Sequence, residues 1–179
     1  MDKKETKLDS QEIYKGRILN LFVDHVLLPN GHTSTREVIR HCQASAILAI
    51  DELGNIILED QYRYPYDSII KEIPAGKCDK DEDPQVTANR ELEEETGYRA
   101  NSLVKLGEYY PSVAYTDEII HLYVATDLVK TNQHLDEDES LDYYKVPLSE
   151  ALNMVLDGRI KDGKTTAALF LYLLKNKKI

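Results

Sequence analysis

The chain of 179 residues has no tryptophan, two phenylalanines and only two cysteines, Cys42 and Cys78. Two cysteines without a C-x-x-C pair indicate neither a disulfide framework nor a zinc site, so a reducing cytoplasm is the simplest location. Basic residues are also scarce, because 22 Lys and Arg stand against 32 Asp and Glu and give a net charge of -10. A nucleic-acid-binding protein needs a basic face to neutralise phosphates, and we therefore expect no nucleic-acid partner.

Long hydrophobic runs are absent as well. The N-terminal residues MDKKETKLDSQEIYKG contain no apolar stretch typical of a secretion signal, and no segment approaches the ~18 apolar residues of a membrane span. We expect neither secretion nor membrane insertion. The chain is nevertheless 42% hydrophobic, and it has twelve tyrosines, most of which we expect in the core and in sheets. Its length suits one ordinary domain with a substantial core.

Residues 1–42 have the pattern of a small β segment. The first twelve residues are polar, and we expect them to be frayed. Apolar residues then recur over 18–28, and an Asn-Gly turn separates this strand from a second one at 33–40. Asn-Gly is a strong signal for a hairpin. We therefore predict an N-terminal β-hairpin or small antiparallel sheet, followed by one main domain over 43–179.

The main domain alternates between strand-like and helix-like patterns. Apolar runs predict strands at 44–50, 56–59, 69–74, 103–110, 119–125 and 141–146. Towards the C-terminus, Ser149 is suited to cap a helix that ends at Gly158, and Asp162 is suited to start the last helix. We expect this last helix to have an apolar stripe made of Ala167, Ala168, Leu171 and Leu174. The alternation predicts an α/β (α+β) fold, in which a mixed β-sheet lies between helices.

The most informative stretch runs from Ala75 to Tyr98 and reads AGKCDKDEDPQVTANRELEEETGY. Within it, Asp83 is a suitable N-cap, Pro84 suits the first helical position, and Gly97 suits the left-handed residue after the last turn. This spacing predicts a helix of about 13 residues.

Acidic residues gather at the unfavourable end of this predicted helix. Glu91, Glu94 and Glu95 are close enough in sequence to share one helix face, where they repel one another. They also lie near the negative end of the helix dipole, which costs each carboxylate about a few tenths of a kcal/mol or more. A divalent cation such as Mg²⁺ turns this repulsion into binding, because it takes carboxylate oxygens as ligands. Arg90 is placed to pair with one of these carboxylates and to fix its orientation. The alternative is a solvated, acidic helix end.

The whole pattern, however, resembles a known motif. From Gly76, five residues lead to Glu82, seven more lead to Arg90-Glu91, and the following positions complete GX5EX7REUXEEXGU. This is similar to the Nudix box, and every fixed position matches. The last position is usually aliphatic and is Tyr98 here. The resemblance implies a Nudix fold, in which Glu82 supports the loop that precedes the helix.

The same resemblance implies roles for the other residues of the box. Mg²⁺, with Mn²⁺ as an alternative, would be held by Glu91 and Glu95, with help from Glu94 and from the main-chain carbonyl of Ala75. Arg90 would orient one of the glutamates. The residues that take part in catalysis would therefore include Arg90 and Glu94.

Two further segments resemble the ADP-ribose pyrophosphatases of this family. Residues 72–77 are similar to their E-x-P-A-G segment, and 158–165 are similar to their G-x-I-x-D-x-K-T segment. These relatives often place a catalytic glutamate in an acidic loop, which implies Glu137 or Glu139 here, with Glu137 slightly favoured as the general base. The alternatives are a solvated charge run over 136–139, or a glutamate of the box as the base.

Two arginines are candidates for binding the substrate. Arg63 and, more weakly, Arg36 each offer a guanidinium fork, which suits bidentate binding of a diphosphate. The alternative for Arg63 is a surface arginine at a β edge. In similar proteins the N-terminal segment packs against or exchanges with a second subunit, so the resemblance also implies a homodimer.

The resemblance implies hydrolysis of the pyrophosphate bond in a nucleoside diphosphate joined to another group. The favoured small-molecule substrates are ADP-ribose and nucleotide sugars, which would give a nucleoside monophosphate and a sugar phosphate. Two departures from the subgroup leave the substrate open, because Val113 stands where proline is usual and His41-Cys42-Gln43 replaces His-Pro-Gly. One alternative is a hydrolase of nucleoside triphosphates or dinucleoside polyphosphates. Another is a non-catalytic, nucleotide-sensing domain, although such domains often lose box carboxylates and this chain keeps them all.

Overall fold

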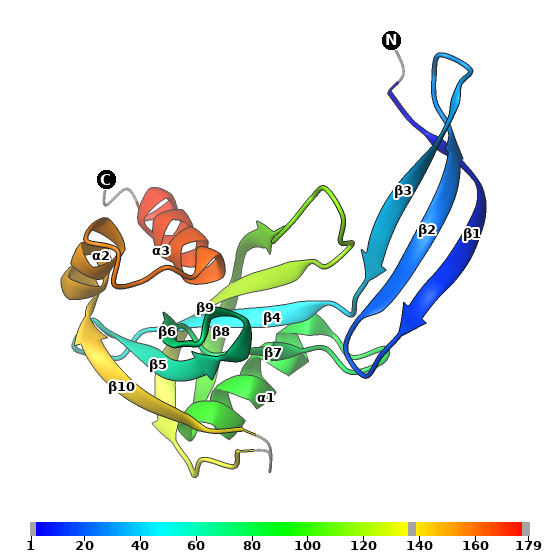
Figure 1. The fold of residues 1–179 in the computed structure, drawn as a ribbon. Helices are drawn as coiled ribbons and strands as arrows, with labels where there is room; N and C mark the ends of the chain where they lie inside the picture. Colours follow the sequence, from blue (N-terminus) through cyan, green and yellow to red (C-terminus); the bar gives the residue numbers. More distant parts are fainter. Residues whose placement is uncertain (1–2, 136–138, 177–179) are drawn as a thin grey trace. The chain divides into compact units, whose positions relative to one another are not determined.

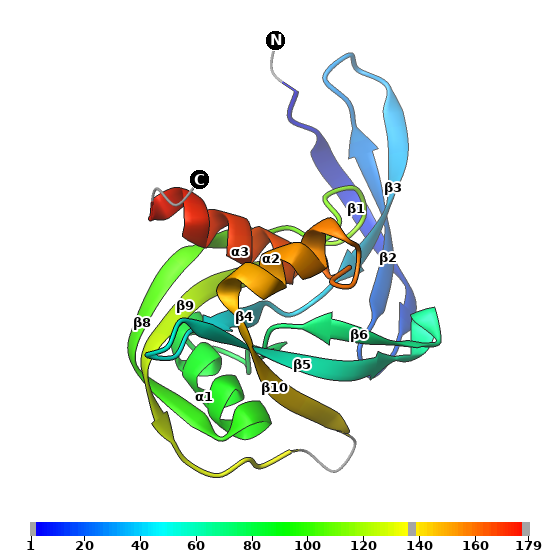
Figure 2. The same cartoon turned by 90° about the vertical axis from the view of Figure 1, so that its left-hand side faces the viewer.

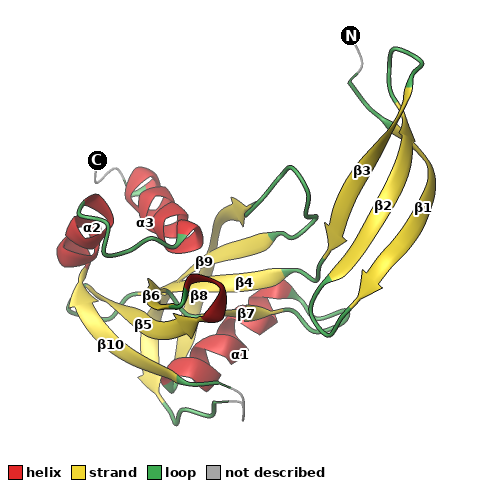
Figure 3. Cartoon of the chain, viewed as in Figure 1, coloured by secondary structure: helices red, strands yellow, loops and turns green. Residues whose placement is uncertain are grey.

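The computed structural model describes residues 3–135 and 139–176. Figure 1 follows the chain by colour, and Figure 3 distinguishes its helices from its strands. None of the helices in the described residues is long and apolar enough to cross a membrane. The chain forms two compact units, of which the first contains the residues up to Cys42 with Tyr110–Ile119, and the second contains Gln43–Tyr109 with the residues from Ile120 onward.

The first unit is built on a three-stranded antiparallel sheet. Its strands β1 (Thr6–Lys15), β2 (Asn20–Leu27) and β3 (Thr33–Arg40) are neighbours in that order. β2 and β3 pair along their whole length, and Gly31 in the turn between them has a φ of 85°. A positive φ is accessible to glycine without a steric penalty. The predicted small antiparallel sheet is therefore confirmed.

The expectation that the first twelve residues are frayed is wrong, because β1 begins at Thr6. Every residue of β1 is exposed, so no apolar pattern marks this strand in the sequence. Main-chain pairing with β2 holds it instead, together with polar contacts such as the hydrogen bond that the Ser10 hydroxyl donates to the buried Asp24.

The second unit contains two sheets. Strand β4 (Ala44–Ala49) lies inside a four-stranded sheet, where it runs parallel to β9 (Ile120–Lys130) and antiparallel to β7 (Ala75–Lys77). Strand β8 (Tyr98–Tyr109) pairs antiparallel with β9 at the edge of this sheet. The second sheet consists of β10 (Leu141–Pro147), β5 (Asn55–Arg63) and β6 (Ser68–Glu72), in that order. The middle strand β5 pairs antiparallel with both neighbours.

The described residues of the second unit include the helices α1 (Pro84–Thr96), α2 (Leu148–Leu156) and α3 (Gly163–Lys175). Helix α1 lies on one side of the four-stranded sheet, and α2 and α3 lie on the other side (Figure 2). A short 3-10 helix, Tyr64–Tyr66, joins β5 to β6. The predicted fold class, a mixed sheet between helices, is confirmed.

Strand β4 lies at the centre of this core. Ala46 and Leu48 pack in the cluster that includes α2 and α3, whereas Ile47 and Ala49 pack in the cluster that includes α1. Alternate residues of a strand point to opposite faces, so both faces of β4 are buried. This explains why β4 reads in the sequence as one continuous apolar run.

The two C-terminal helices differ in part from the prediction. Ser149 lies inside α2, whose N-cap position is Pro147 and has no side-chain cap, so the predicted Ser149 cap is wrong. Asp162 does cap α3, because its carboxylate accepts a hydrogen bond from the main-chain N–H of Thr165. The predicted stripe on α3 is displaced, since Leu174 is exposed and the buried apolar residues are Ala168, Leu169 and Leu173.

Other differences concern strand limits and tyrosines. Strand β8 begins at Tyr98, directly after Gly97, and the glycine-containing stretch Ala75–Lys77 forms β7 instead of a loop. Most tyrosines do lie in sheets, as expected, because seven of the twelve belong to strands, but only Tyr123 among them is buried. The hydroxyl group lets tyrosine keep a polar end in water, and the exposed ones are Tyr14, Tyr62, Tyr64, Tyr66, Tyr110 and Tyr115.

Candidate active site

Helix α1 begins and ends where the sequence predicts. The carboxylate of Asp83 accepts a hydrogen bond from the N–H of Gln85 at 2.8 Å, Pro84 is the first helical residue, and Gly97 has a φ of 63°. Ala88 and Leu92, four residues apart, are fully buried and anchor the helix to the core. The opposite ends and the buried face of α1 are thus fixed by local signals.

The C-terminal end of α1 is held by the segment that follows β9. Its last carbonyl groups have no partner within the helix. The N–H of His134 donates to the carbonyl of Glu94 at 2.8 Å, and Nε2 of Gln133 donates to that of Glu95 at 2.6 Å. Lys130 Nζ lies 3.2 Å from the Thr96 carbonyl oxygen and thereby places a positive charge at the negative end of the helix dipole.

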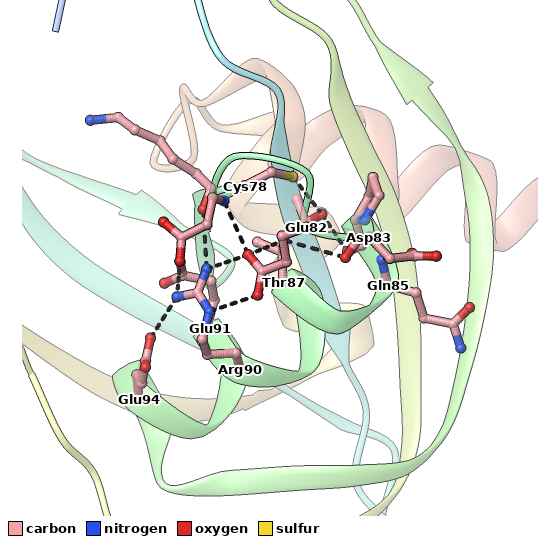
Figure 4. Close-up of polar contacts among 12 residues, drawn as sticks. Cys78, Glu82, Asp83, Gln85, Thr87, Arg90, Glu91 and Glu94 are labelled. Atoms are coloured by element: carbon pink, nitrogen blue, oxygen red, sulfur yellow. Dashed lines mark hydrogen bonds and ion pairs between the residues drawn. The ribbon is translucent and has the colours of Figure 1, made fainter.

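Arg90 of α1 connects the carboxylates of Glu82, Glu91 and Glu94 (Figure 4). Its Nη2 lies 2.9 Å from Glu82, and its Nη1 lies 2.7 Å from Glu91 and 2.9 Å from Glu94. The hydrogen bonds from Arg90 lower the pKa of Glu82 to about 2. Glu82 also accepts hydrogen bonds from the Asp79 N–H and the Thr87 hydroxyl. The expected pairing of Arg90 with box glutamates is present, and Glu82 ties the preceding turn to the helix.

Glu91 lies against the main chain of Gly76. A side chain at position 76 would overlap with the Glu91 carboxyl group, so only glycine permits this close approach. Glu91 is 8% exposed. Burial raises the pKa of Glu91 to about 7, although the charge of Arg90 acts in the opposite direction.

Glu95 is the most deeply buried acid of the box, with 3% of its surface exposed. Its Oε2 accepts a hydrogen bond from the N–H of Ala75 at 2.8 Å. Burial raises the pKa of Glu95 well above its usual value, and the charges of Glu59 and Glu91 raise it further. The carboxylates of Glu91 and Glu95 therefore both lie against the β7 main chain, in a position that favours neutral acids unless a cation is present.

The two segments that resemble those of the ADP-ribose pyrophosphatases, 72–77 and 158–165, meet around Glu72. Arg63 binds the buried Glu72 carboxylate bidentately, with Nε and Nη2 each 2.7 Å from one oxygen, and Lys164 pairs with the same group. Burial acts to raise the pKa of Glu72, but these two cations lower it overall. In addition, the Thr165 hydroxyl accepts a hydrogen bond from the N–H of Ile73 at 2.9 Å.

Arg63 itself is held in a fixed orientation. It lies at the end of β5, where the described residues pair it with Ser68 of β6 on one side only, and its side chain binds the buried Glu72. Its side chain remains 40% exposed. The guanidinium Nη1 has no hydrogen-bond partner in the part of the chain that the structure describes.

The acidic group of this site also includes Glu59 of β5. Glu59 is 2% exposed, and burial raises its pKa to about 8. Its Oε1 has no hydrogen-bond partner among the described residues. The charge of Glu139 acts on Glu59, Glu91 and Glu95 alike and raises the pKa of each, which places Glu139 close to the same cluster.

The donor chemistry of this cluster fits a divalent cation. Its carboxylates are hard oxygen ligands, and two of them, Glu91 and Glu95, approach the main chain of β7. Within residues 3–135 and 139–176, no three His, Cys, Asp or Glu side chains converge on a single point. A metal site here therefore needs main-chain oxygens or water in addition to the carboxylates, as Mg²⁺ sites commonly have.

The other predicted residues lie elsewhere or outside the description. Arg36 belongs to the first unit, where its Nε and Nη2 bind Glu5 at 3.0 and 2.6 Å. Glu137 lies outside the described residues. The structure thus brings together Ala75, Arg63, Arg90, Glu91, Glu94, Glu95 and Glu139 within the second unit.

Three residues of the site were not predicted. Glu59 carries one signal in the sequence, which is a charge directly after the apolar run Ile56-Ile57-Leu58. Lys164 belongs to the segment 158–165, which is similar to one in the ADP-ribose pyrophosphatases. It lies more than ninety residues after Glu72, so the pairing of the two side chains depends on the tertiary fold. Lys130 carries no local signal that relates it to α1.

Comparison with known proteins identifies this arrangement. Residues 40–169 match the NUDIX domain, and residues 5–39 match the nucleoside diphosphate sugar hydrolase N-terminal domain. The chain is 47% identical over 167 residues to a methanol dehydrogenase activator of Bacillus methanolicus, with 92% of this chain and 90% of that protein covered. It is 42% identical over 173 residues to an ADP-ribose pyrophosphatase of Bacillus subtilis (strain 168), with 96% and 94% covered.

A solved structure agrees with these sequence matches. The crystal structure of an ADP compounds hydrolase superposes with a TM-score of 0.87 at 26% identity, and 98% of this chain and 97% of that chain are covered. The NUDIX match spans most of the chain and includes α1 with all the carboxylates of the box. The protein is therefore a member of the Nudix hydrolase family.

Proposed function

We propose that this protein hydrolyses the pyrophosphate bond of ADP-ribose or of a nucleoside diphosphate sugar, giving a nucleoside monophosphate and a sugar phosphate. The main support is the pair of buried acids, Glu91 and Glu95, that lie against the β7 main chain with raised pKa values. The relatives named ADP-ribose pyrophosphatase and ADP compounds hydrolase, and the match to a nucleoside diphosphate sugar hydrolase domain, support this substrate class.

Nudix hydrolases generally need a divalent metal ion. Here the ion would be Mg²⁺, with Mn²⁺ as the alternative, and Glu91, Glu95, Glu94 and the carbonyl of Ala75 would hold it. When bound, such an ion polarises phosphoryl oxygens and lowers the pKa of a coordinated water. Arg90 keeps Glu91 and Glu94 in fixed orientations through hydrogen bonds of 2.7 and 2.9 Å.

Arg63 would bind a phosphate of the substrate. Glu72 engages Nε and Nη2 of Arg63 and so fixes the plane of the guanidinium, which leaves Nη1 for an oxygen of the diphosphate. Because the orientation is fixed before the substrate binds, little side-chain entropy is lost on binding. Lys164 pairs with the same buried carboxylate and, together with Arg63, keeps Glu72 ionised.

A glutamate would take the proton of the attacking water. Glu139 and Glu137 are the candidates, and the charge of Glu139 reaches Glu91 and Glu95. Attack of the deprotonated water on one phosphorus breaks the bridging P–O bond, and the other phosphate leaves with the bridging oxygen. Glu94 is the alternative base, since it lies in the box and its side chain is 38% exposed.

The first unit would form the contact between two copies of the chain. All ten residues of β1 are exposed, and among them are the apolar side chains of Leu8, Ile13 and Tyr14. A second copy would cover these side chains and make a homodimer. Arg36 is carried by the same unit and would contribute to substrate binding within that dimer.

The direct experiment is a substrate panel with Mg²⁺ and with Mn²⁺. We would incubate the protein with ADP-ribose, several nucleotide sugars, nucleoside triphosphates and dinucleoside polyphosphates, and identify the products by mass spectrometry. ADP-ribose should give AMP and ribose 5-phosphate. Cleavage of triphosphates alone would contradict the proposed substrate class. Tight binding of ADP-ribose without cleavage in either metal would indicate a sensing domain instead.

A further inference from the structure

The buried carboxylates of the described residues divide into two groups. One group has a basic partner within ion-pair distance: Asp24 with Arg40, Glu72 with Arg63 and Lys164, and Glu91 with Arg90. The other group consists of Glu59 and Glu95, which form no ion pair with any Lys, Arg or His in residues 3–135 and 139–176. Two buried acids therefore lack a counter-charge.

Glu59 is the less satisfied of the two. Glu95 accepts one hydrogen bond from the Ala75 N–H, whereas Oε1 of Glu59 has no hydrogen-bond partner in the described part of the chain. Only 2% of Glu59 is exposed, so water does not solvate it from the surface. A buried polar atom without a partner is strongly unfavourable, and a native protein that keeps one needs a reason such as a bound ion.

The position of Glu59 connects it to the active site. It faces Glu72 of β6 and Tyr143 of β10 in the register of the sheet, and two residues separate Glu72 from the start of β7. Its charge is the largest electrostatic contribution that raises the pKa of Glu95. The two acids without counter-charges thus belong to one cluster.

We propose that Glu59 is a further cation-holding residue of this active site, where it and Glu95 supply the two negative charges that a hydrated divalent cation neutralises. The inference rests on the proposed function, since it assumes the same cation. Mg²⁺ usually keeps several waters, and their hydrogens need acceptors in the surrounding protein. Oε1 of Glu59 is a buried acceptor without a partner among the described residues, and it would accept one of these hydrogens.

A basic side chain of the protein explains the buried Glu59 carboxylate less well than a bound cation does. Lys164 is the cation that acts most strongly on the Glu59 charge, but its Nζ already pairs with Glu72 and with Asp162, the latter at 3.2 Å. Arg63 is likewise engaged bidentately by Glu72. The positive charges near Glu59 are therefore committed to other carboxylates.

The test is a Mn²⁺ titration of the metal-free protein by isothermal calorimetry. The variant Glu59→Gln keeps the size of the side chain and removes its charge. The matched control is Asp60→Asn, because Asp60 is the next residue of the same strand and pairs with Lys71 on the other face. We expect Glu59→Gln to raise the Kd for Mn²⁺ about 10-fold or more, as the loss of a residue that hydrogen-bonds to the metal ligands commonly does. Asp60→Asn should leave the Kd within about 2-fold of the wild-type value.

A second readout separates a cation-holding role from a structural one. Without metal, Glu59→Gln should melt at a higher temperature than the wild type, because burial disfavours the ionised form of this acid and the amide carries no ionisable group. If Glu59→Gln does not fold, Glu59→Met serves the same purpose with an apolar side chain of similar length. Unchanged Mn²⁺ affinity together with a lower melting temperature in EDTA would show that Glu59 is a structural partner of Lys164 and would overturn the inference.

The outcomes also separate this inference from the proposed function. If the wild type binds Mn²⁺ and cleaves its substrate while Glu59→Gln binds Mn²⁺ equally well, only the role of Glu59 is wrong. If the wild type binds no Mn²⁺ and cleaves none of the panel, the proposed function fails first and the role of Glu59 fails with it.

Discussion

Two buried carboxylates, one in each unit, show how differently this chain treats acidic residues. In the first unit, Asp24 accepts a hydrogen bond from Ser10 and forms an ion pair with Arg40 at 2.7 Å. In the second unit, Glu95 has one main-chain hydrogen bond and no basic partner among the described residues. Asp24 is satisfied by the protein itself, whereas Glu95 is not. The difference supports the proposal that Glu95 binds a cation, whereas Asp24 stabilises its sheet.

The opposite pKa shifts express the same contrast. The hydrogen bond from Ser10, helped by Arg40, lowers the pKa of Asp24, whereas burial and neighbouring acids raise the pKa of Glu95. A lowered pKa means that the fold stabilises the ionised acid, and a raised pKa means that the fold disfavours it. Variants at these and neighbouring positions test the contrast between Asp24 and Glu95.

The largest effect is expected for Glu95→Gln. The amide keeps the shape of the side chain but loses the charge that the cation needs, so kcat should fall by roughly 1,000-fold or more while the fold remains intact. Steady-state kinetics and circular dichroism test this. The control is Glu93→Gln on the same helix, which is partly exposed and only loosely paired with Arg99 at 3.9 Å. Near-normal metal-dependent turnover by Glu95→Gln would show that Glu95 is not a ligand.

Gly76→Ala should have the next largest effect. The added methyl group overlaps with the Glu91 carboxyl group, so Glu91 must move away from β7. Displacement of a catalytic group by about 1 Å commonly costs about 100-fold in rate. Gly107→Ala is the control, because its methyl group would meet only the end of the Leu171 side chain at 3.2 Å. Equal kcat values for the two variants would contradict the importance of this close approach.

Arg63→Lys should mainly affect substrate binding. Lysine keeps the charge but cannot bind Glu72 bidentately and present a further N–H group at the same time. We expect KM to rise about 10-fold with a smaller change in kcat. Arg99→Lys, at an exposed arginine on β8, is the control. A KM unchanged by Arg63→Lys would show that Arg63 only supports Glu72.

The stability of the second unit should depend on pH and on metal. Glu91 and Glu59 have folded-state pKa values of about 7 and about 8, above the ~4.3 of an unfolded glutamate. Between these values the folded state keeps protons that the unfolded state has released. In EDTA, the free energy of unfolding should therefore fall as pH rises from about 5 to 8, by an amount on the order of a few kcal/mol.

Urea unfolding at several pH values measures this dependence. Mn²⁺ favours the ionised acids, so its addition should flatten the decline or reverse it. A metal-free protein that becomes more stable over the same pH range would contradict the raised pKa values of these acids.

The smallest effect on activity is expected for Asp24→Asn. The lowered pKa of Asp24 means that its contribution to stability is present above the unfolded pKa of ~3.9 and is lost as pH falls. At pH 7 the variant should lose about 1 kcal/mol of stability, because its ion pair with Arg40 is removed. Mn²⁺ affinity should stay within about 2-fold of the wild type, and a large loss of affinity would remove the contrast with Glu95.

Local signals account for the parts of the site that the sequence predicts well. The N-cap Asp83, Pro84 and the left-handed Gly97 determine the limits of α1, and the spacing of the box then determines which acids share a face. Gly76 and Glu82 belong to the same box as the helix residues that they contact, so the motif identifies both partners of each contact. Short-range spacing is therefore sufficient for the core of the site.

Residues that depend on tertiary contacts could not be predicted in this way. Lys164 reaches Glu72 from the start of α3, and Lys130 reaches the end of α1 from β9. Prediction of Glu59 as a site residue would have required the sheet register, which places it opposite Glu72. Strand β1 was missed for a related reason, because its polar residues are held by main-chain pairing and not by burial.

The most direct test of the central claim is anomalous diffraction from crystals soaked in Mn²⁺ with a non-hydrolysable ADP-ribose analogue. We expect a manganese peak beside Glu91 and Glu95, within coordination distance of at least one oxygen of each. Clear density for the analogue with no manganese at these carboxylates would contradict it.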